Sequence, residues 1–189
     1  MDRKDFEIMA PVGSYESLHA AIDAGADAVY FGVEGLNMRA RSSVNFTLAD
    51  LHEIARVCAA AGVKSYLTVN TIMYDADIPV CHAVIDAARD AGLSAIIASD
   101  IAAILYARSI GVEVHISTQA NISNIEAVRF YAQWADVVVL ARELSMDQVA
   151  AISAAIRRDN ITGPSGRPVR IEMFCHGALC IAVSGKCYL

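Results

Sequence analysis

A pattern of small residues followed by apolar runs repeats along the chain. In each copy, an alanine-rich segment ends in glycine or a short polar break, and apolar, mostly β-branched residues follow: AGADAVYFGV, AGVKSYLTVN, AGLSAIIASD, IGVEVHISTQ and WADVVVLARE. Gly25, Gly62, Gly92 and Gly111 stand where a helix would end in left-handed backbone, which glycine adopts without steric penalty. The continuous apolar runs are typical of strands buried on both faces of a parallel sheet.

The segments between these runs predict helices. Two of them open with capping-box patterns, Thr47–Asp50 and Ser145–Gln148, whose side chains can satisfy the free backbone donors of a helix start. Four polar residues stand at positions suited to N-caps: Ser14, Asp100, Asn121 and Ser145. Apolar residues then recur at helical spacing, in one group of Leu51, Ile54 and Cys58 and in another of Val80, Val84 and Ala87.

Seven strands can be counted in this way: FEIMAPV, DAVYFGV, SYLTVN, AIIAS, VEVHIST, DVVVLA and RIEMFCH. Each except the last precedes a helical pattern, which gives seven βα units of roughly 27 residues. A doubly wound sheet usually carries G-x-G-x-x-G after its first strand, whereas APVGSYES follows here. The predicted fold class is therefore α/β, a (β/α)8 TIM-type barrel that is incomplete. Residues 1–189 are expected to be one truncated N-terminal barrel domain of a longer protein.

Composition narrows the class of protein. The 189 residues are 56% hydrophobic and 19% charged, which favours a large core over disorder. Mean hydropathy is +0.41, but no uncharged apolar run approaches the roughly 18 residues of a spanning helix, and no secretory signal is visible at the start. We therefore expect a cytoplasmic protein with no membrane span. The net charge of −6 argues against nucleic-acid binding by charge alone.

Candidate site residues lie where the strands end, because barrel active sites are built at that edge. Asn70, Gln119 and Arg142 follow the third, fifth and sixth strands and are predicted to bind substrate. An arginine there suits an anion, although an ion pair with Glu143 or another acid would explain Arg142 equally well.

Two further candidates come from a loop and a strand. Arg39 and Arg41 lie in the long loop after the second strand, where an anion-binding role and a solvated surface are equally open. His115 falls inside the fifth strand, and a satisfied core histidine is the favoured interpretation there.

The cysteines divide into two groups. Cys58 and Cys81 lie among apolar neighbours on predicted helices and are expected to be buried thiols. Cys175, Cys180 and Cys187 crowd the end of the chain with the spacing C-x(4)-C-x(6)-C. In a protein without a secretory signal, such crowding points to a metal, an iron–sulfur cluster or redox chemistry. A cysteine-rich core turn and a catalytic thiol near His176 remain alternatives.

The ending Glu172-Met-Phe-Cys-His-Gly-Ala-Leu-Cys-Ile-Ala-Val-Ser-Gly-Lys-Cys187 resembles the signature of peptidase family U32. That signature runs Glu-x-Phe-x-x-Gly, then Ser or Ala, an aliphatic residue, Cys, four residues and Gly-x-Cys. The opening APVGSYESLHAAIDAGADAVYFG and the segments HISTQ and LAREL also look like those of the family. The resemblance therefore extends over essentially the whole chain.

The resemblance implies a function that the spacing alone does not. Several family members look like oxygen-independent hydroxylation proteins that act on a tRNA uridine, an rRNA cytidine or a ubiquinone precursor. It implies prephenate as hydroxyl donor and an iron–sulfur cluster, [4Fe–4S] being expected, with Cys180 and Cys187 as two ligands and the others downstream. Glu172 and His176 become candidate catalytic residues.

Several alternatives stay open. The family name implies a collagenase-like peptidase, and a noncatalytic subunit of a hydroxylation complex, for example one acting on a quinone, is a third possibility. The expected partners are RNA, bound through a region outside these residues, or a small-molecule substrate. Homo- or hetero-oligomers are possible because an incomplete barrel leaves strand edges open.

Overall fold

A computed structural model describes residues 2–33, 46–177 and 182–186 of the chain. The strands are β1 (Met9–Pro11), β2 (Ala28–Phe31), β3 (Lys64–Val69), β4 (Ala95–Ala98), β5 (Val114–Ile116), β6 (Val137–Val139) and β7 (Arg170–Glu172). The α-helices are α1 (Tyr15–Asp23), α2 (Leu51–Ala60), α3 (Ile78–Asp90), α4 (Ile101–Ser109), α5 (Ile125–Tyr131) and α6 (Met146–Arg158). Short 3-10 helices are η1 (Arg3–Asp5), η2 (Leu48–Asp50), η3 (Asp75–Asp77) and η4 (Thr118–Ala120).

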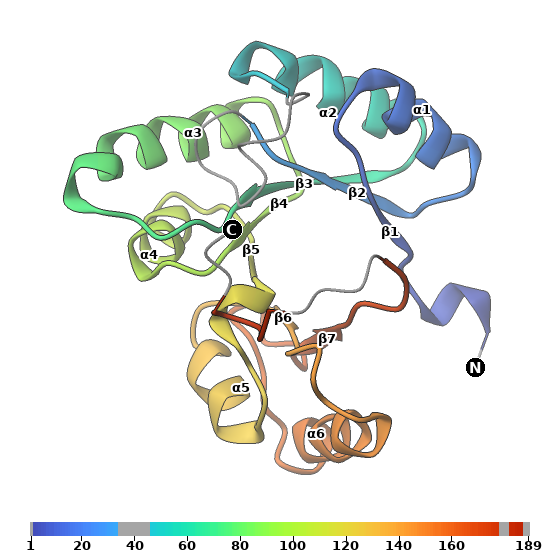
Figure 1. Ribbon diagram of the computed structural model, residues 1–189, viewed down its shortest axis with the longest axis vertical. Helices are drawn as coiled ribbons and strands as arrows, with labels where there is room; N and C mark the ends of the chain where they lie inside the picture. The colour runs from blue at the N-terminus through green and yellow to red at the C-terminus, as the bar shows by residue number, and fades with distance from the viewer. Residues whose placement is uncertain (1, 34–45, 178–181, 187–189) are drawn as a thin grey trace. The chain divides into compact units, whose positions relative to one another are not determined.

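The strands follow the order β1-β2-β3-β4-β5-β6-β7 in one sheet, and helices alternate with them along the chain (Figure 1). The strand pairs β1–β2, β2–β3, β5–β6 and β6–β7 are parallel. Sequential parallel strands joined by helices are the defining arrangement of a TIM-type fold. The predicted incomplete (β/α)8 architecture is confirmed. The chain divides into two compact units, residues 1–97 and 98–189.

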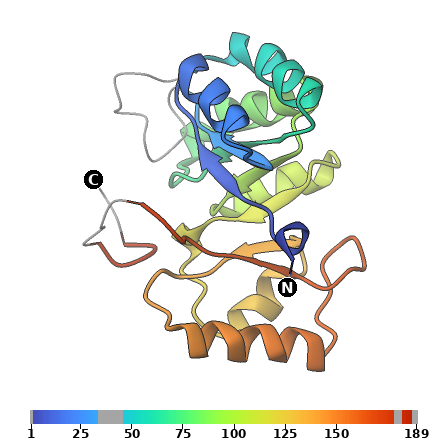
Figure 2. The same ribbon diagram turned by 90° about the vertical axis from the view of Figure 1, so that its right-hand side faces the viewer.

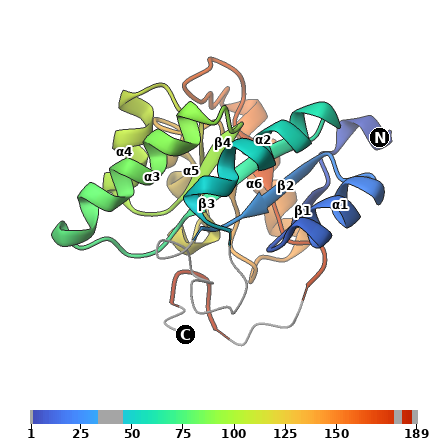
Figure 3. The ribbon, with the colours of Figure 1, turned by 90° about the horizontal axis from the view of Figure 1, so that it is seen from above.

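The first unit places an apolar cluster on one face of its strands. Met9 pairs with Ala28 and Ala28 with Lys64, so alternate residues of β1, β2 and β3 share this face. The cluster comprises buried Ala28, Tyr66, Ala95 and Ile97, against which Met9 and Tyr30 pack. Helices α1, α2 and α3 follow one another along the strands of this unit (Figure 3).

At the amino-terminal end of the same face, two side chains contact the carboxylate of Glu7. Lys64 Nζ lies 2.5 Å from Glu7 Oε2, and the Tyr66 hydroxyl donates to Glu7 Oε1 at 2.6 Å. The carboxylate of Glu7 therefore lies close to a cation and a hydroxyl at the start of the sheet.

The second unit is built on β5, β6 and β7, with α6 running along one side of it (Figure 2). His115 pairs with Val137, and Val137 pairs with Arg170, so these three residues lie on one face. Ile116, Val138, Val139 and Leu140 are buried, which supplies the apolar part of this unit's core. The ionisable side chains of His115 and Arg170 nevertheless share a face with Val137.

The helix boundaries agree with the local sequence signals, with one correction. Ser14, Asp100 and Ser145 cap α1, α4 and α6 by accepting backbone N–H groups. The N-cap prediction for Asn121 is wrong: this residue ends η4 in left-handed backbone at φ 51°, and Asn124 caps α5 instead. Asparagine tolerates the left-handed region better than most residues, which suits Asn121, and it is a preferred N-cap residue, which suits Asn124.

Several predicted strands are too long. Phe6 and Ile8 are about half exposed, and β1 begins only at Met9, because Asp27 takes the hydrogen bond of Ile8 N at 2.7 Å. The RIEMFCH run ends as a strand at Glu172, and Phe174 is exposed. Val80 is also exposed, whereas Cys81, Val84, Ile85 and Ala88 form the buried side of α3. An apolar run thus marks a strand's position better than its ends.

The predicted glycine stops are confirmed, since Gly25, Gly62, Gly92 and Gly111 all have positive φ between 69° and 84°. Among the helices of the described ranges, none has the length and apolar character needed to cross a membrane.

Candidate functional site

The carboxyl ends of β5, β6 and β7 meet in the second unit through backbone contacts beyond the strands. Ile122 forms a parallel bridge with Leu140, and Leu140 N donates to Glu172 O at 3.0 Å. These bonds bring the segments after β5 and β6 to the end of β7. Since active sites of TIM-type folds occupy this edge, it is the candidate site.

Arg142 and Glu143 form a turn directly after β6 and hold a distant segment of the chain. Arg142 Nη2 donates to Ala182 O at 3.0 Å, while Arg142 N and Nε lie 3.2 and 3.4 Å from Ser184 Oγ. Ser184 N donates to Glu143 Oε1 at 2.8 Å. This backbone donor, more than the nearby guanidinium, holds the pKa of Glu143 below its ordinary value.

Gly185 packs too closely for any side chain. A Cβ built on it would lie 2.7 Å from Gln119 O and 3.0 Å from Asn121 Cβ, and its φ is +75°. Both the contact and the backbone angle therefore require glycine. The segment from Ala182 to Gly185 consequently rests on two loops, the turn after β6 and the turn that contains η4.

Four ionisable side chains cluster on one face of β5 and β7. His115 is buried, with Nε2 3.4 Å from Glu113 Oε1 and Nδ1 3.9 Å from Glu172 Oε2. Arg170 Nη2 donates to the same Glu113 oxygen at 3.2 Å. The side chain of Glu172 is 24% exposed and Glu172 ends β7, so its carboxylate lies at the edge that forms the candidate site. The imidazole of His115 is buried in the core. The prediction that His115 lies in the core is confirmed by its burial.

The residues after β7 are open to solvent. Cys175 is a free, exposed cysteine, and His176 beside it is exposed as well. Cys58 and Cys81, by contrast, are buried as predicted, and burial raises the pKa of the Cys58 thiol. Within residues 2–33, 46–177 and 182–186, no group of three or more His, Cys, Asp or Glu side chains could hold a metal.

The remaining predicted residues fall in two places. Asn70 follows β3 in the first unit and is half-buried, and Gln119 lies in η4 of the second unit. Arg39, Arg41, Cys180 and Cys187 lie outside the described residues. The second unit thus brings together Gln119, Arg142 and Glu172 at one edge of its strands.

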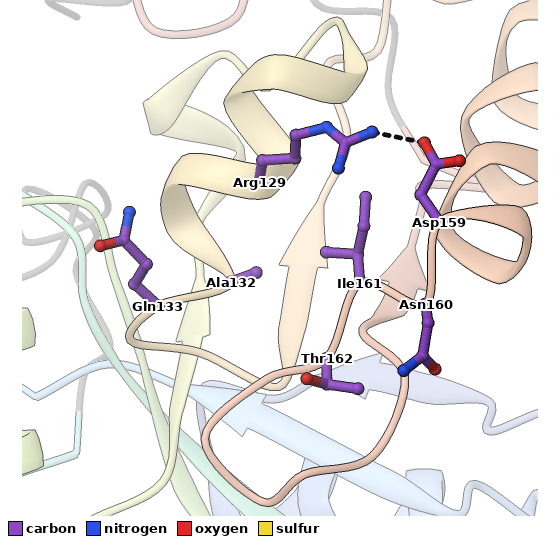
Figure 4. Close-up of a pocket in the computed structure, with 7 residues that line it drawn as sticks. All are labelled: Arg129, Ala132, Gln133, Asp159, Asn160, Ile161 and Thr162. Carbon is purple, nitrogen blue, oxygen red and sulfur yellow. Dashed lines mark hydrogen bonds and ion pairs between the residues drawn. The ribbon is translucent and has the colours of Figure 1, made fainter.

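A pocket of about 320 Å³ lies elsewhere in the second unit, between the end of α5 and the segment after α6 (Figure 4). An Arg129–Asp159 ion pair spans it, and Ile161 and Thr162 line it. The two guanidinium groups of Arg158 and Arg129 hold the pKa of Asp159 low. Because the pocket adjoins the segments that lead into β6 and β7, it belongs to their amino-terminal ends, away from the candidate site.

Sequence reasoning missed three contributors. Glu113 and Arg170 could have been found from alternation, because Glu113-Val-His115 and Arg170-Ile-Glu172 each place ionisable residues on one face of a strand. Ser184 gives no such signal apart from its position next to Gly185, and only the fold shows what it contacts.

Comparisons with known proteins agree with this architecture. A family model described as Peptidase family U32 matches residues 13–189. The chain is 71% identical over 189 residues to a protein named Collagenase from Porphyromonas gingivalis, of which it covers 46%. It is 34% identical to tRNA hydroxylation protein P1 of Bacillus subtilis, with 97% of this chain and 41% of that protein covered.

A third relative and a solved structure complete the comparison. Identity to the 23S rRNA 5-hydroxycytidine C2501 synthase of Escherichia coli is 34%, covering 97% of this chain and 26% of that protein. The structure of the U32 peptidase Mk0906 matches with a TM-score of 0.66 at 15% identity, over 88% of this chain and 66% of the other, which supports the fold. The chain spans less than half the length of each of the three relatives.

Proposed function

Because the chain belongs to peptidase family U32, we propose that its protein takes part in oxygen-independent hydroxylation of RNA, on a tRNA uridine or an rRNA cytidine. The observation that carries the proposal is the match along 97% of this chain to proteins named for tRNA hydroxylation and for rRNA hydroxycytidine synthesis. Such a reaction on cellular RNA suits a cytoplasmic protein. With a net charge of −6, RNA binding would rely on basic residues outside this chain.

An iron–sulfur cluster is the cofactor we propose, with Cys180 and Cys187 as two of its ligands. Thiolates are the donors that such clusters prefer, so the chemistry of this pair fits. Two thiols are fewer than the four that a [4Fe–4S] cluster takes, so the other ligands would come from the rest of the protein or from a partner. When bound, the cluster would supply one-electron redox chemistry.

Prephenate is the proposed hydroxyl donor, and its two carboxylates need cationic or hydrogen-bonding partners. Arg142 is exposed at the edge of the second unit and, with Gln119, is a candidate to bind it; Asn70, Arg39 and Arg41 are the others. Replacing Arg142 by alanine should weaken prephenate binding to the full-length protein, as measured by calorimetry. Unchanged binding would remove Arg142 from this role.

Glu172 and His176 are the candidate catalytic residues. Glu172 ends β7 with a partly exposed carboxylate, which can accept or return a proton at the candidate edge. His176 is exposed four residues later, and histidine is the side chain that serves most often in general acid–base catalysis.

A peptidase is the second candidate, favoured by the 71% identity to the protein named Collagenase. A cysteine peptidase needs a thiolate near a base. Burial raises the pKa of Cys58, which disfavours that thiol, whereas Cys175 is exposed and adjacent in sequence to His176. Cys175 is therefore the residue on which a peptidase mechanism would be tested.

The two candidates separate in one experiment on the full-length protein, purified without oxygen. Iron and acid-labile sulfide are measured in the wild type, in a Cys180→Ala/Cys187→Ala variant and in a Cys175→Ala control, and each is assayed for peptide cleavage. Iron and sulfide lost only in the double variant support the cluster. Protein without iron whose peptide cleavage disappears with Cys175→Ala supports the peptidase and contradicts the cluster. A cluster that forms only with a second subunit would support the noncatalytic-partner alternative.

A further inference from the structure

The segment Ala182–Gly185 makes several polar contacts with the rest of the second unit. Ser184 is only 1% exposed, although it lies in a turn rather than in a helix or strand. Its N–H, its hydroxyl oxygen and the carbonyl of Ala182 all have partners in the Arg142–Glu143 turn. Ser184 is therefore a buried residue whose polar groups are hydrogen-bonded, as buried polar groups in folded proteins generally are.

The partners come from charged side chains, which make stronger hydrogen bonds than neutral ones. Glu143 supplies a carboxylate to the N–H of Ser184, and Arg142 supplies a guanidinium to the carbonyl of Ala182. Opposite them, Gly185 lies against Gln119 and Asn121 without room for a Cβ. The segment therefore contacts two turns, the one after β5 and the one after β6.

We propose that Arg142, Glu143 and the turn from Gln119 to Asn121 form a cradle whose task is to fix Ala182–Gly185. Arg142 and Glu143 are then positioning residues. Ser184 lies four residues after Cys180 and three before Cys187 in the sequence, so fixing Ser184 should limit where the chain can place either cysteine. This last step rests on the proposed cluster, whereas the cradle itself does not.

Amide hydrogen exchange in the full-length protein without cofactor tests the cradle directly. In Glu143→Ala the Ser184 amide should exchange at least about tenfold faster than in the wild type, since its charged acceptor is gone and local opening becomes easier. Arg142→Ala should accelerate the same amide because it removes the guanidinium that donates to the carbonyl of Ala182. Glu126→Ala, which removes an exposed carboxylate paired with Arg129 in the same unit, should leave it unchanged.

Two controls keep the result interpretable. Near-ultraviolet circular dichroism establishes that each variant is folded, and Ser184→Ala offers a milder disruption that removes only the hydroxyl. An unchanged Ser184 exchange rate in both Glu143→Ala and Arg142→Ala overturns the cradle. The cradle is also overturned if Arg142→Ala weakens prephenate binding while exchange at Ser184 stays at the wild-type rate, because Arg142 then acts on the ligand alone.

Iron retention tests the link to the cysteines. If the wild type holds iron, Glu143→Ala should lose it to a chelator several-fold faster than Glu126→Ala does. Equal rates would contradict the positioning role. If the wild type holds no iron, the proposed cluster fails and the role toward the cysteines fails with it, while the exchange result still decides the cradle.

Discussion

The two units differ in the side chains on one face of their strands. In the first unit this is the face that bears Tyr66, and in the second it is the face that bears His115. In the first unit this face is an apolar cluster, with Glu7 engaged by Lys64 and Tyr66 at its amino-terminal end. In the second unit, Glu113, His115, Arg170 and Glu172 lie together on the face that bears His115. The face of the first unit is thus mainly apolar, whereas the face of the second unit brings ionisable side chains close together.

This difference between the two faces suggests that the units contribute differently to stability and to the candidate site. Burying apolar surface stabilises a unit, whereas grouping ionisable side chains costs desolvation and is tolerated where chemistry needs them. The edge of the second unit also receives Ser184 and Gly185 from the signature segment. We therefore expect the first unit to contribute mainly stability and the second to contribute most of the site.

Thiol labelling should give the largest contrast between the units. Cys58 and Cys81 are buried in the first unit, while Cys175 is exposed in the second. Labelling a buried thiol requires local opening, so Cys58 and Cys81 should react at least about 100-fold more slowly than Cys175 in the folded protein. Iodoacetamide labelling followed by peptide mass spectrometry measures the rates. Comparable rates at Cys58 and Cys175 would contradict a closed first unit.

Much of this contrast could be predicted from the sequence, and the reason is local. Cys58 lies at helical spacing from Leu51 and Ile54, so its burial follows from periodicity alone. The glycine stops at positions 25, 62, 92 and 111 likewise depend only on backbone sterics.

The candidate site was less accessible to sequence reasoning because its contacts join distant residues. Arg142 and Ser184 are 42 positions apart, and nothing in either local pattern pairs them. The choice between an anion site and an ion pair with Glu143 therefore missed what the fold shows: both residues bind the same backbone segment. The predicted strands were also too long, since Phe6 lies before β1 begins and Phe174 lies after β7 ends.

A core truncation should have the next largest effect. Ile97 is 6% exposed in the apolar cluster of the first unit, so Ile97→Ala should lower the free energy of unfolding by about 2–5 kcal/mol. Ile72 is 58% exposed in the same unit, and Ile72→Ala should change it by no more than about 0.5 kcal/mol. Urea unfolding monitored by circular dichroism provides both values. Equal losses would mean that the cluster is not a stabilising core.

A matched pair of substitutions to phenylalanine compares the two faces directly. Tyr66→Phe removes the hydroxyl that donates to Glu7, a hydrogen bond to a charged group, and should cost about 1.5–3 kcal/mol. His115→Phe replaces a buried polar ring with an apolar one and should cost less, because its contacts with Glu113 and Glu172 are long, at 3.4 and 3.9 Å, and both carboxylates keep access to water. Urea unfolding ranks the two variants. A larger loss from His115→Phe would show that the ionisable group around it is structural.

The smallest expected effect concerns the acid sensitivity of the first unit. Asp27 Oδ2 accepts from Ile8 N at 2.7 Å and from Arg3 Nη2 at 2.8 Å, and these contacts, the backbone one first, hold the pKa of Asp27 below its ordinary value. The folded-state pKa is thus lower than that of the unfolded chain. Asp27 therefore contributes stability that is present above the pKa of the unfolded chain, about 3.9, and is lost as pH falls through the folded-state pKa.

The Asp27→Asn variant should accordingly have a lower free energy of unfolding than the wild type at pH 7. As the pH falls from about 5 to about 3, the free energy of unfolding should decrease less in the variant than in the wild type. The Asp27 side chain is 39% exposed, so solvent screening should keep the difference at pH 7 below about 1 kcal/mol. Asp23→Asn removes an exposed carboxylate from the end of α1 and controls for the loss of one negative charge. Urea unfolding across this pH range distinguishes the outcomes. If Asp27→Asn and the wild type keep a constant difference at every pH, the ionised form of Asp27 does not stabilise the folded first unit.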